Sequence, residues 1–132
     1  MLQSGQAIEF HSFPTVSKEH LKEYADASGD YNPIHQDEEV AKKAGLPGVI
    51  AHGMYIAGLI AERARLFIEG EQRLEIQSFQ TRFRAMTLVG DTPSVGGMVK
   101  EASDEGISLE LQARNQRGEV TTVSHIRYKI LK

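Results

Sequence analysis

The sequence predicts an α+β fold in which an antiparallel sheet packs around one long apolar helix. Residues 53–68 carry apolar side chains on nearly every side of their first half, as expected for a buried helix. Residues 107–114 alternate apolar and polar side chains, and residues 120–131 are rich in β-branched residues, which is typical of strands. The 132 residues suffice for one domain with its own core.

The first predicted elements are a short strand and a helix. Residues 7–10 fit an edge strand. Ser17 is a suitable N-cap for the helix that follows, and Gly29 suits its C-terminal stop. We therefore expect this helix to end just before Asp30.

The next segment is predicted to be irregular and then briefly helical. Residues 30–35 form a tight connector, because Pro33 disfavours helical backbone at the residue before it. Asp37 is a suitable N-cap for a short helix whose charges match the helix dipole and which closes at Gly45. Residues 46–48 then form a turn.

The rest of the chain is predicted to form strands. The alternation in residues 74–85 changes phase near Ser78. A sheet of about five strands around one helix leaves exposed edges, which dimerisation could cover. The strands expected are 74–85, 95–102, 107–114 and 120–131, with a hairpin turn at 115–118.

The composition limits the chemistry that the chain can perform. There is no cysteine, which excludes a disulfide scaffold, a thiolate nucleophile and a cysteine-ligated metal centre. The formal charge of -3 argues against a nucleic-acid partner. The longest apolar stretch, residues 54–61, is too short for membrane insertion, and the first ten residues do not resemble a signal peptide. We therefore expect a cytoplasmic protein.

Two of the five histidines lie where a functional site is expected. His11 lies near a strand end and His20 in the first turn of a helix, so both are expected to be ordinary surface residues. His125 alternates in phase on a strand and is expected to pack or to lie at a rim. His35 and His52 remain, in irregular segments beside proline, glycine or carboxylates.

Asp30 and His35 lie five residues apart across an Asn-Pro turn. This spacing can bring a carboxylate and an imidazole to the same side of a loop, where they could hold one water between a base and an acid. Alternatively, Asp30 only caps the turn and His35 is exposed to solvent. The spacing alone does not decide between these interpretations.

His52 and Gly53 stand at the start of the predicted buried helix. A helix N-terminus offers unsatisfied N–H groups, and glycine lets a ligand oxygen approach the backbone closely. This arrangement suits an oxyanion. Alternatively, Gly53 serves tight packing and His52 caps the helix or forms a local hydrogen bond.

A metal site formed by His35, Asp37 and Glu38 is not expected. The three residues lie too close along the chain for a comfortable three-ligand site. Asp37 is already explained as an N-cap.

Two motifs occur at a fixed spacing: YADASGDYNPIH at residues 24–35, followed by Asp37, and IAHGM at residues 50–54. Together they resemble the signature of the MaoC-like hydratases and dehydratases, which include (R)-specific enoyl-CoA hydratases and β-hydroxyacyl-ACP dehydratase subunits. The resemblance is strongest from about residue 17 to 60. The strand-rich remainder agrees in length and order.

The resemblance implies one hot-dog domain over residues 1–132, an antiparallel sheet around a central helix, with the active site at a dimer interface. Asp30 and His35 match the catalytic pair that holds a water. Asn32 matches the asparagine that helps to fix the loop. Gly53 matches the residue whose N–H polarises the thioester carbonyl, and His52 has a supporting role there.

The resemblance also implies the reaction: interconversion of trans-2-enoyl and (R)-3-hydroxyacyl thioesters by addition or elimination of water. No metal or redox cofactor is expected, because coenzyme A or acyl carrier protein enters as part of the substrate. A homodimer or higher homo-oligomer is expected. The alternatives are a dehydratase of acyl carrier protein substrates with a partner subunit, a non-catalytic acyl-thioester binding protein, and a thioesterase.

One position departs from the pattern of the family. Some (R)-hydratases carry a serine where this chain has Gly58, so the pocket is either widened or independent of that hydroxyl. The departure leaves the preferred acyl chain length open. The residues expected to shape the acyl pocket are Tyr31, Leu46, Val49 and Tyr55.

Overall fold

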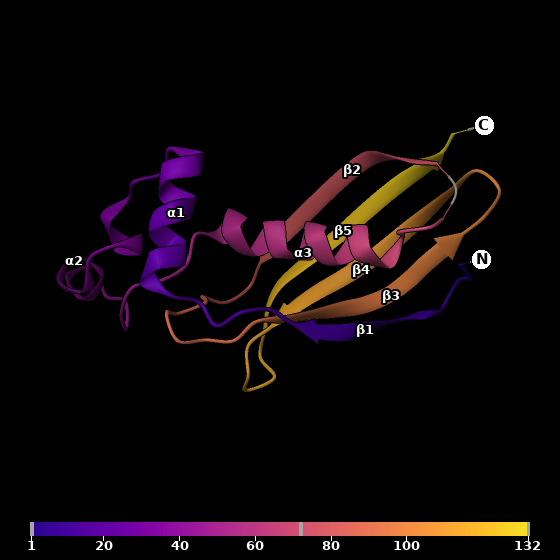
Figure 1. Ribbon diagram of the computed structural model, residues 1–132. Helices are drawn as coiled ribbons and strands as arrows, with labels where there is room; N and C mark the ends of the chain where they lie inside the picture. The colour runs from indigo at the N-terminus through magenta and orange to yellow at the C-terminus, as the bar shows by residue number, and fades with distance from the viewer. Residues whose placement is uncertain (1, 72, 132) are drawn as a thin grey trace.

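The computed structural model describes residues 2–71 and 73–131, which form a five-stranded antiparallel sheet with one long helix across a face of it. Two shorter helices lie beyond one end of the sheet (Figure 1). The predicted α+β class is confirmed. In chain order the elements are β1 (Ala7–Ser12), α1 (Lys18–Ser28), the 3₁₀ helix η1 (Pro33–His35), α2 (Glu38–Lys43), α3 (Gly53–Phe67), β2 (Leu74–Phe83), β3 (Ser94–Ala102), β4 (Gly106–Arg114) and β5 (Val120–Ile130).

The strand order is β1-β3-β4-β5-β2. Strands β3, β4 and β5 are a meander, as the alternation predicted. Strand β2 instead pairs with β5 at the far edge, and the chain then crosses the sheet to β3, which lies beside β1. The predicted phase change at Ser78 corresponds to an irregularity in the pairing of β2 with β5 between Ile76 and Ser78.

Helix α3 buries one face against the sheet. The buried apolar residues include Ile56, Ile60 and Ala64, whose spacing of four places them in one row. Met54 and Gly58 are exposed on α3. The apolar character around the first half of α3 is therefore only partly covered by this chain. Within the described residues, no helix combines the length and hydropathy needed to cross a membrane.

Arg63 fastens α3 to strand β1. Its guanidinium is buried and donates two hydrogen bonds to the main-chain carbonyl of Glu9, at 3.1 Å from Nε and 2.8 Å from Nη2. Glu9 lies where the pairing of β1 with β3 is interrupted. The arginine therefore satisfies a carbonyl at the interruption and holds α3 in place along the sheet.

The edge strand β2 exposes apolar side chains. Ile76 is 56% exposed and Phe83 is 50% exposed, and Met86 just beyond the strand is 45% exposed. In contrast, the inner strand β4 alternates buried and half-buried residues along its length. The β2 edge is thus an apolar surface that this chain leaves uncovered.

Asp91 joins three parts of the fold on the loop before β3. Its buried carboxylate accepts the N–H of Leu88 at 2.9 Å and the side-chain amide of Gln116 at 3.0 Å, and Arg117 lies 3.4 Å away. The main-chain carbonyl of Asp91 accepts the N–H of Val16 at 2.8 Å. Burial raises the pKa of Asp91, but these donors outweigh burial and hold its pKa below the usual range.

Replacing Asp91 with asparagine is expected to lower the free energy of unfolding by about 1–3 kcal/mol at neutral pH. A depressed pKa in the folded state stabilises the fold above the unfolded pKa, and that contribution is lost as pH falls through the folded pKa. The difference in free energy of unfolding between the wild type and Asp91→Asn should therefore decrease below about pH 4. Urea unfolding between neutral pH and this range measures the difference, with the exposed Asp104→Asn variant as the control. A gap that widened on acidification would contradict the role of the ionised carboxylate.

Candidate active site

Asp30 directly follows α1 at an abrupt change of chain direction. Gly29 ends the helix with a left-handed φ of 79°, and its N–H donates to the carbonyl of Ala25. The Asp30 carboxylate accepts the N–H of Asn32 at 3.2 Å through Oδ1. One carboxylate oxygen therefore serves the turn, and the exposed residue keeps further acceptor capacity for a water.

Asn32 fixes the start of η1. Its side-chain oxygen accepts the N–H of Ile34 at 3.2 Å, which makes it the N-cap of the 3₁₀ turn. Pro33 occupies the first helical position, where its missing N–H costs nothing. The short turn that follows brings His35 back toward Asp30.

His35 is buried, with 8% of its surface exposed. The interpretation of His35 as a solvent-exposed residue is therefore wrong. Its Nδ1 lies 2.7 Å from the main-chain carbonyl of Ile50. Since a carbonyl only accepts, Nδ1 donates this hydrogen bond, and in the neutral imidazole Nε2 then has a free lone pair. The N–H of Ile50 in turn donates to the carbonyl of Ile34 at 3.3 Å, which ties the two motifs together.

His52 lies directly against His35. The two imidazoles stack with centroids 3.9 Å apart and planes inclined by 25°. The Nε2 of His52 lies 3.0 Å from the main-chain carbonyl of Asp30, and the side chain makes no cap hydrogen bond at α3. The local capping role considered for His52 is therefore wrong, because its bond spans 22 residues.

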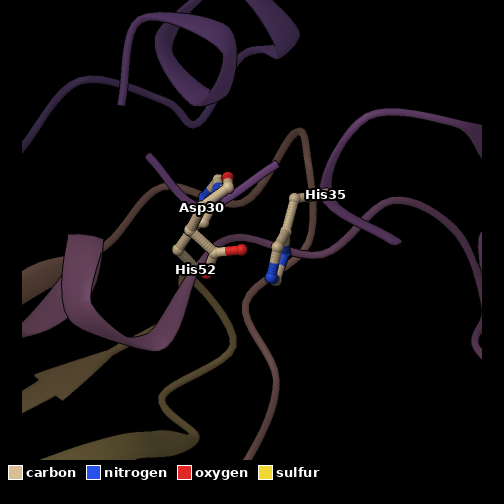
Figure 2. Close-up of side chains that lie close together, drawn as sticks. All are labelled: Asp30, His35 and His52. Atoms are coloured by element: carbon tan, nitrogen blue, oxygen red, sulfur yellow. The ribbon is translucent and has the colours of Figure 1, made fainter. Parts of the chain in front are cut away.

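Asp30, His35 and His52 form a cluster in which one carboxylate oxygen and one ring nitrogen of each histidine lie within 4.8 Å of one another. Figure 2 shows these three side chains close together. One water can bridge two acceptors at this separation by donating one hydrogen bond to each. A metal ion fits the cluster less well. Imidazole lone pairs lie in the ring plane, and planes inclined by only 25° do not converge within a metal–nitrogen bond of about 2 Å.

Gly53 is the first residue of α3, where a helix N–H has no partner within the helix. The residue is exposed. A Cβ at this position would lie only 3.0 Å from the Phe83 ring at the end of β2. The Phe83 ring therefore supports the packing interpretation of Gly53, and its role toward a ligand oxygen stays a prediction.

The residues expected to shape the acyl pocket lie in different environments. Tyr31 is 60% exposed, and its hydroxyl donates to Asp26 at 3.0 Å, which raises the pKa of Tyr31. Val49 is wholly buried in the core. Leu46 and Tyr55 are half-buried, and burial followed by the charge of Glu23 raises the pKa of Tyr55.

Gly58 lies in open space. Among the described residues, no atom outside the backbone of its own helix and its chain neighbours lies within 4 Å of the position that a Cβ would take. A serine hydroxyl at this position would therefore fit in the single chain without any rearrangement.

Two aromatic residues of the site were not found from the sequence. Phe83 contacts Gly53, and Tyr24 packs on His52 with ring centroids 4.8 Å apart. Both fit the periodicity of core residues, so their patterns gave no signal for a site. His11 is exposed, as expected. His20, expected at the surface, is half-buried, and His125, expected to pack or to lie at a rim, is exposed.

The chain belongs to the family of MaoC-like domains, whose family model, described as "MaoC like domain", matches residues 2–122. Its fold is the hot-dog fold of that family.

Curated relatives agree with this membership. The chain is 34% identical over 90 residues to 3-hydroxybutyryl-CoA dehydratase of Methylorubrum extorquens, covering 68% of this chain and 57% of that protein. It is 32% identical over 92 residues to 3-hydroxyacyl-thioester dehydratase X of Mycobacterium tuberculosis, covering 70% of this chain and 30% of that protein. Eight curated relatives are covered over 3% to 57% of their own length, so the chain matches only part of each.

Solved structures share the architecture over nearly the whole chain. The (R)-hydratase from A. caviae involved in PHA biosynthesis superimposes with a TM-score of 0.86 at 22% identity, over 98% of both chains. A MaoC-like dehydratase superimposes with a TM-score of 0.85 at 28% identity, over 98% of this chain and 41% of that one. A chain of the ChsH1-ChsH2 complex from Mycobacterium tuberculosis superimposes with a TM-score of 0.86 at 18% identity, over 99% of this chain and 100% of that one.

Proposed function

We propose that the protein interconverts trans-2-enoyl and (R)-3-hydroxyacyl thioesters by adding or eliminating water. The observation that carries this proposal is the pairing of the Asp30 carboxylate with His35, whose free Nε2 lies on the side opposite its bond to Ile50. The 3-hydroxyacyl-thioester and 3-hydroxybutyryl-CoA dehydratases among the relatives support the reaction class.

The proposed mechanism places one water between Asp30 and His35. The water donates one O–H to each acceptor, so its oxygen lone pair faces the β carbon of the enoyl group. As the C–O bond forms, Asp30 takes one proton, and the pair returns that proton to the α carbon. The hydroxyl keeps the other proton, and the site ends in its starting state.

The start of α3 would stabilise the negative charge that develops during the proposed reaction. Addition at the β carbon moves negative charge onto the thioester oxygen as an enolate. The N–H of Gly53, at the positive end of the helix dipole, would donate to that oxygen. The exposed Gly53 gives the oxygen room to approach the backbone.

The test is hydration of crotonyl-CoA, followed by loss of the conjugated enoyl absorbance and by chiral analysis of the product. The proposal expects the (R)-3-hydroxy thioester. Release of free thiol without hydration would show a thioesterase instead. Saturable binding without either reaction would show an acyl-thioester binding protein. The same acyl group on acyl carrier protein, with and without a partner subunit, distinguishes the carriers.

The proposal includes a homodimer that completes the site. Three large apolar side chains beside the site are at least 50% exposed: Tyr31, Met54 and Phe83. Tyr31 follows Asp30 in the chain, Met54 follows Gly53, and Phe83 faces Gly53 from the end of β2. A second copy laid there would cover them and enclose the acyl chain. Sedimentation is expected to give about twice the chain mass of 14.6 kDa. The cytoplasmic location predicted from the sequence also remains part of the proposal.

The acyl pocket remains a proposal as well. Tyr31 and Tyr55 supply partly accessible surface near the site, and Leu46 is half-buried on the loop before α3. Val49 would support the wall of the pocket, since it lies in the core. Coenzyme A or acyl carrier protein would enter with the substrate.

Removal of metal ions is expected to leave the hydration rate unchanged. Asp30, His35 and the Gly53 N–H supply a base, a partner for the water and an oxyanion donor without a metal. Initial rates before and after dialysis against EDTA measure this. A loss of activity that zinc or magnesium restored would contradict the proposed chemistry.

A further inference from the structure

His52 occupies the centre of the site, although the proposed reaction does not use it. Its side chain is almost wholly buried, with 2% exposed, and lies between two rings. His35 stacks on it at 3.9 Å, and Tyr24 packs on it at 4.8 Å with an inclination of 57°. The next residue in the chain is Gly53.

The hydrogen bonds of His52 fix its tautomer. The carbonyl of Asp30 can only accept, so the Nε2 of His52 carries the proton and donates across 3.0 Å. Its Nδ1 is buried and has no hydrogen-bond partner in the described part of the chain. His52 therefore acts on Asp30 as a hydrogen-bond donor, and the proposed reaction assigns it no proton transfer.

The bond to His52 is the long-range anchor of Asp30. The other hydrogen bonds recorded for Asp30 within the described residues are local ones, to Ser28 at 3.2 Å, and from Asn32 at 3.2 Å. Asp30 also follows the left-handed Gly29 on an exposed loop. Local bonds shape the turn at Asp30, and the bond from His52 ties Asp30 itself to the start of α3. The bonds of Ile34 and His35 to Ile50 tie the later part of the loop to the segment before α3.

We infer that His52 is a positioning residue that holds Asp30, His35 and Gly53 in one arrangement. Its Nε2–H fixes the main chain of Asp30, its face supports the ring of His35, and its backbone leads directly into Gly53. This inference rests on the proposed function and deepens it, because it states how three separate parts of the chain keep their spacing.

Two variants separate the donor of His52 from its ring. His52→Gln can place an amide N–H near the position of Nε2 and lacks the ring. His52→Phe keeps a flat ring and lacks the donor. We expect His52→Phe to lower kcat for hydration about 10–100-fold with KM nearly unchanged, since small displacements of a positioned base are costly. We expect His52→Gln to restore kcat to within about fivefold of the wild type.

A matched control is His125→Gln, on the exposed side of β5, which is expected to keep wild-type kinetics. Circular dichroism and thermal unfolding establish that each variant is folded. Equal losses in His52→Gln and His52→Phe, or wild-type kcat in His52→Phe, would overturn the inference.

A measurement on the unmodified protein tests the same inference without any variant. Nitrogen NMR of the imidazoles is expected to show a proton on the Nε2 of His52 and a proton on the Nδ1 of His35. A His52 ring with no proton on Nε2 would overturn the inference even if the protein folds and is active. Absence of hydration with the expected tautomers would count against the proposed function alone.

Discussion

Replacing Asp30 with asparagine is expected to lower kcat for crotonyl-CoA hydration by about 10²–10⁴-fold. An amide oxygen can still accept the N–H of Asn32, so the turn keeps its hydrogen bond while the base is lost. Asp30 is exposed, so the change buries no new polar group. Initial rates together with circular dichroism separate this catalytic loss from unfolding.

The matched control is Asp26→Asn, which changes an exposed carboxylate of α1 that bonds only the hydroxyl of Tyr31 among the described side chains. It is expected to keep a rate close to the wild type. If Asp30→Asn also kept such a rate, Asp30 would not be the base.

His35→Asn provides the companion test of the pair. An asparagine amide can donate to the carbonyl of Ile50 in place of Nδ1, so the buried bond at 2.7 Å has a replacement. No acceptor remains at the position of Nε2. A loss of similar size to that of Asp30→Asn is expected, and the double variant should lose little more, because both residues act on one water.

The helices could be predicted from the sequence because their signals are local. Ser17 accepts the N–H of His20, and Asp37 accepts those of Glu39 and Val40, as their positions indicated. A cap depends on residues within one turn, and a single sequence contains all of them.

The strand order could not be predicted in the same way. Alternation tells which face of a strand is buried, but it does not name the neighbouring strand. The placement of β2 beside β5 therefore appears only in the fold. The contact between Phe83 and Gly53 depends on that placement, so it could not be predicted from the sequence either.

The candidate site combines a local signal, which the sequence contains, with long-range contacts, which it does not reveal. Asp30 and His35 are five residues apart, and their spacing correctly suggested that they could meet. The burial of His35 depends on its bond to Ile50, which is 15 residues away. The role of His52 depends on a bond across 22 residues, so periodicity could not distinguish it from a capping residue.

Replacing Gly53 with proline is expected to lower kcat/KM by about 10²–10³-fold relative to Gly53→Ala. Proline removes the N–H that would face the enolate oxygen. It is well tolerated at the first position of a helix, because the N–H there has no helical partner. His52 has φ -59° and ψ 134°, a conformation that a residue before proline adopts readily.

Alanine is the necessary reference because both substitutions add a Cβ against the ring of Phe83, 3.0 Å away, and only proline removes the donor. Steric effects of the Cβ on Phe83 and on the acyl group should therefore appear in both variants. Proline also adds Cγ and Cδ at the nitrogen, so the ratio of the two variants measures the loss of the donor together with the volume of these two atoms. If alanine and proline were equally impaired, crowding at Phe83 would explain the glycine, and the oxyanion would have to be stabilised elsewhere. A large ratio with similar thermal stability would support the Gly53 N–H as the donor.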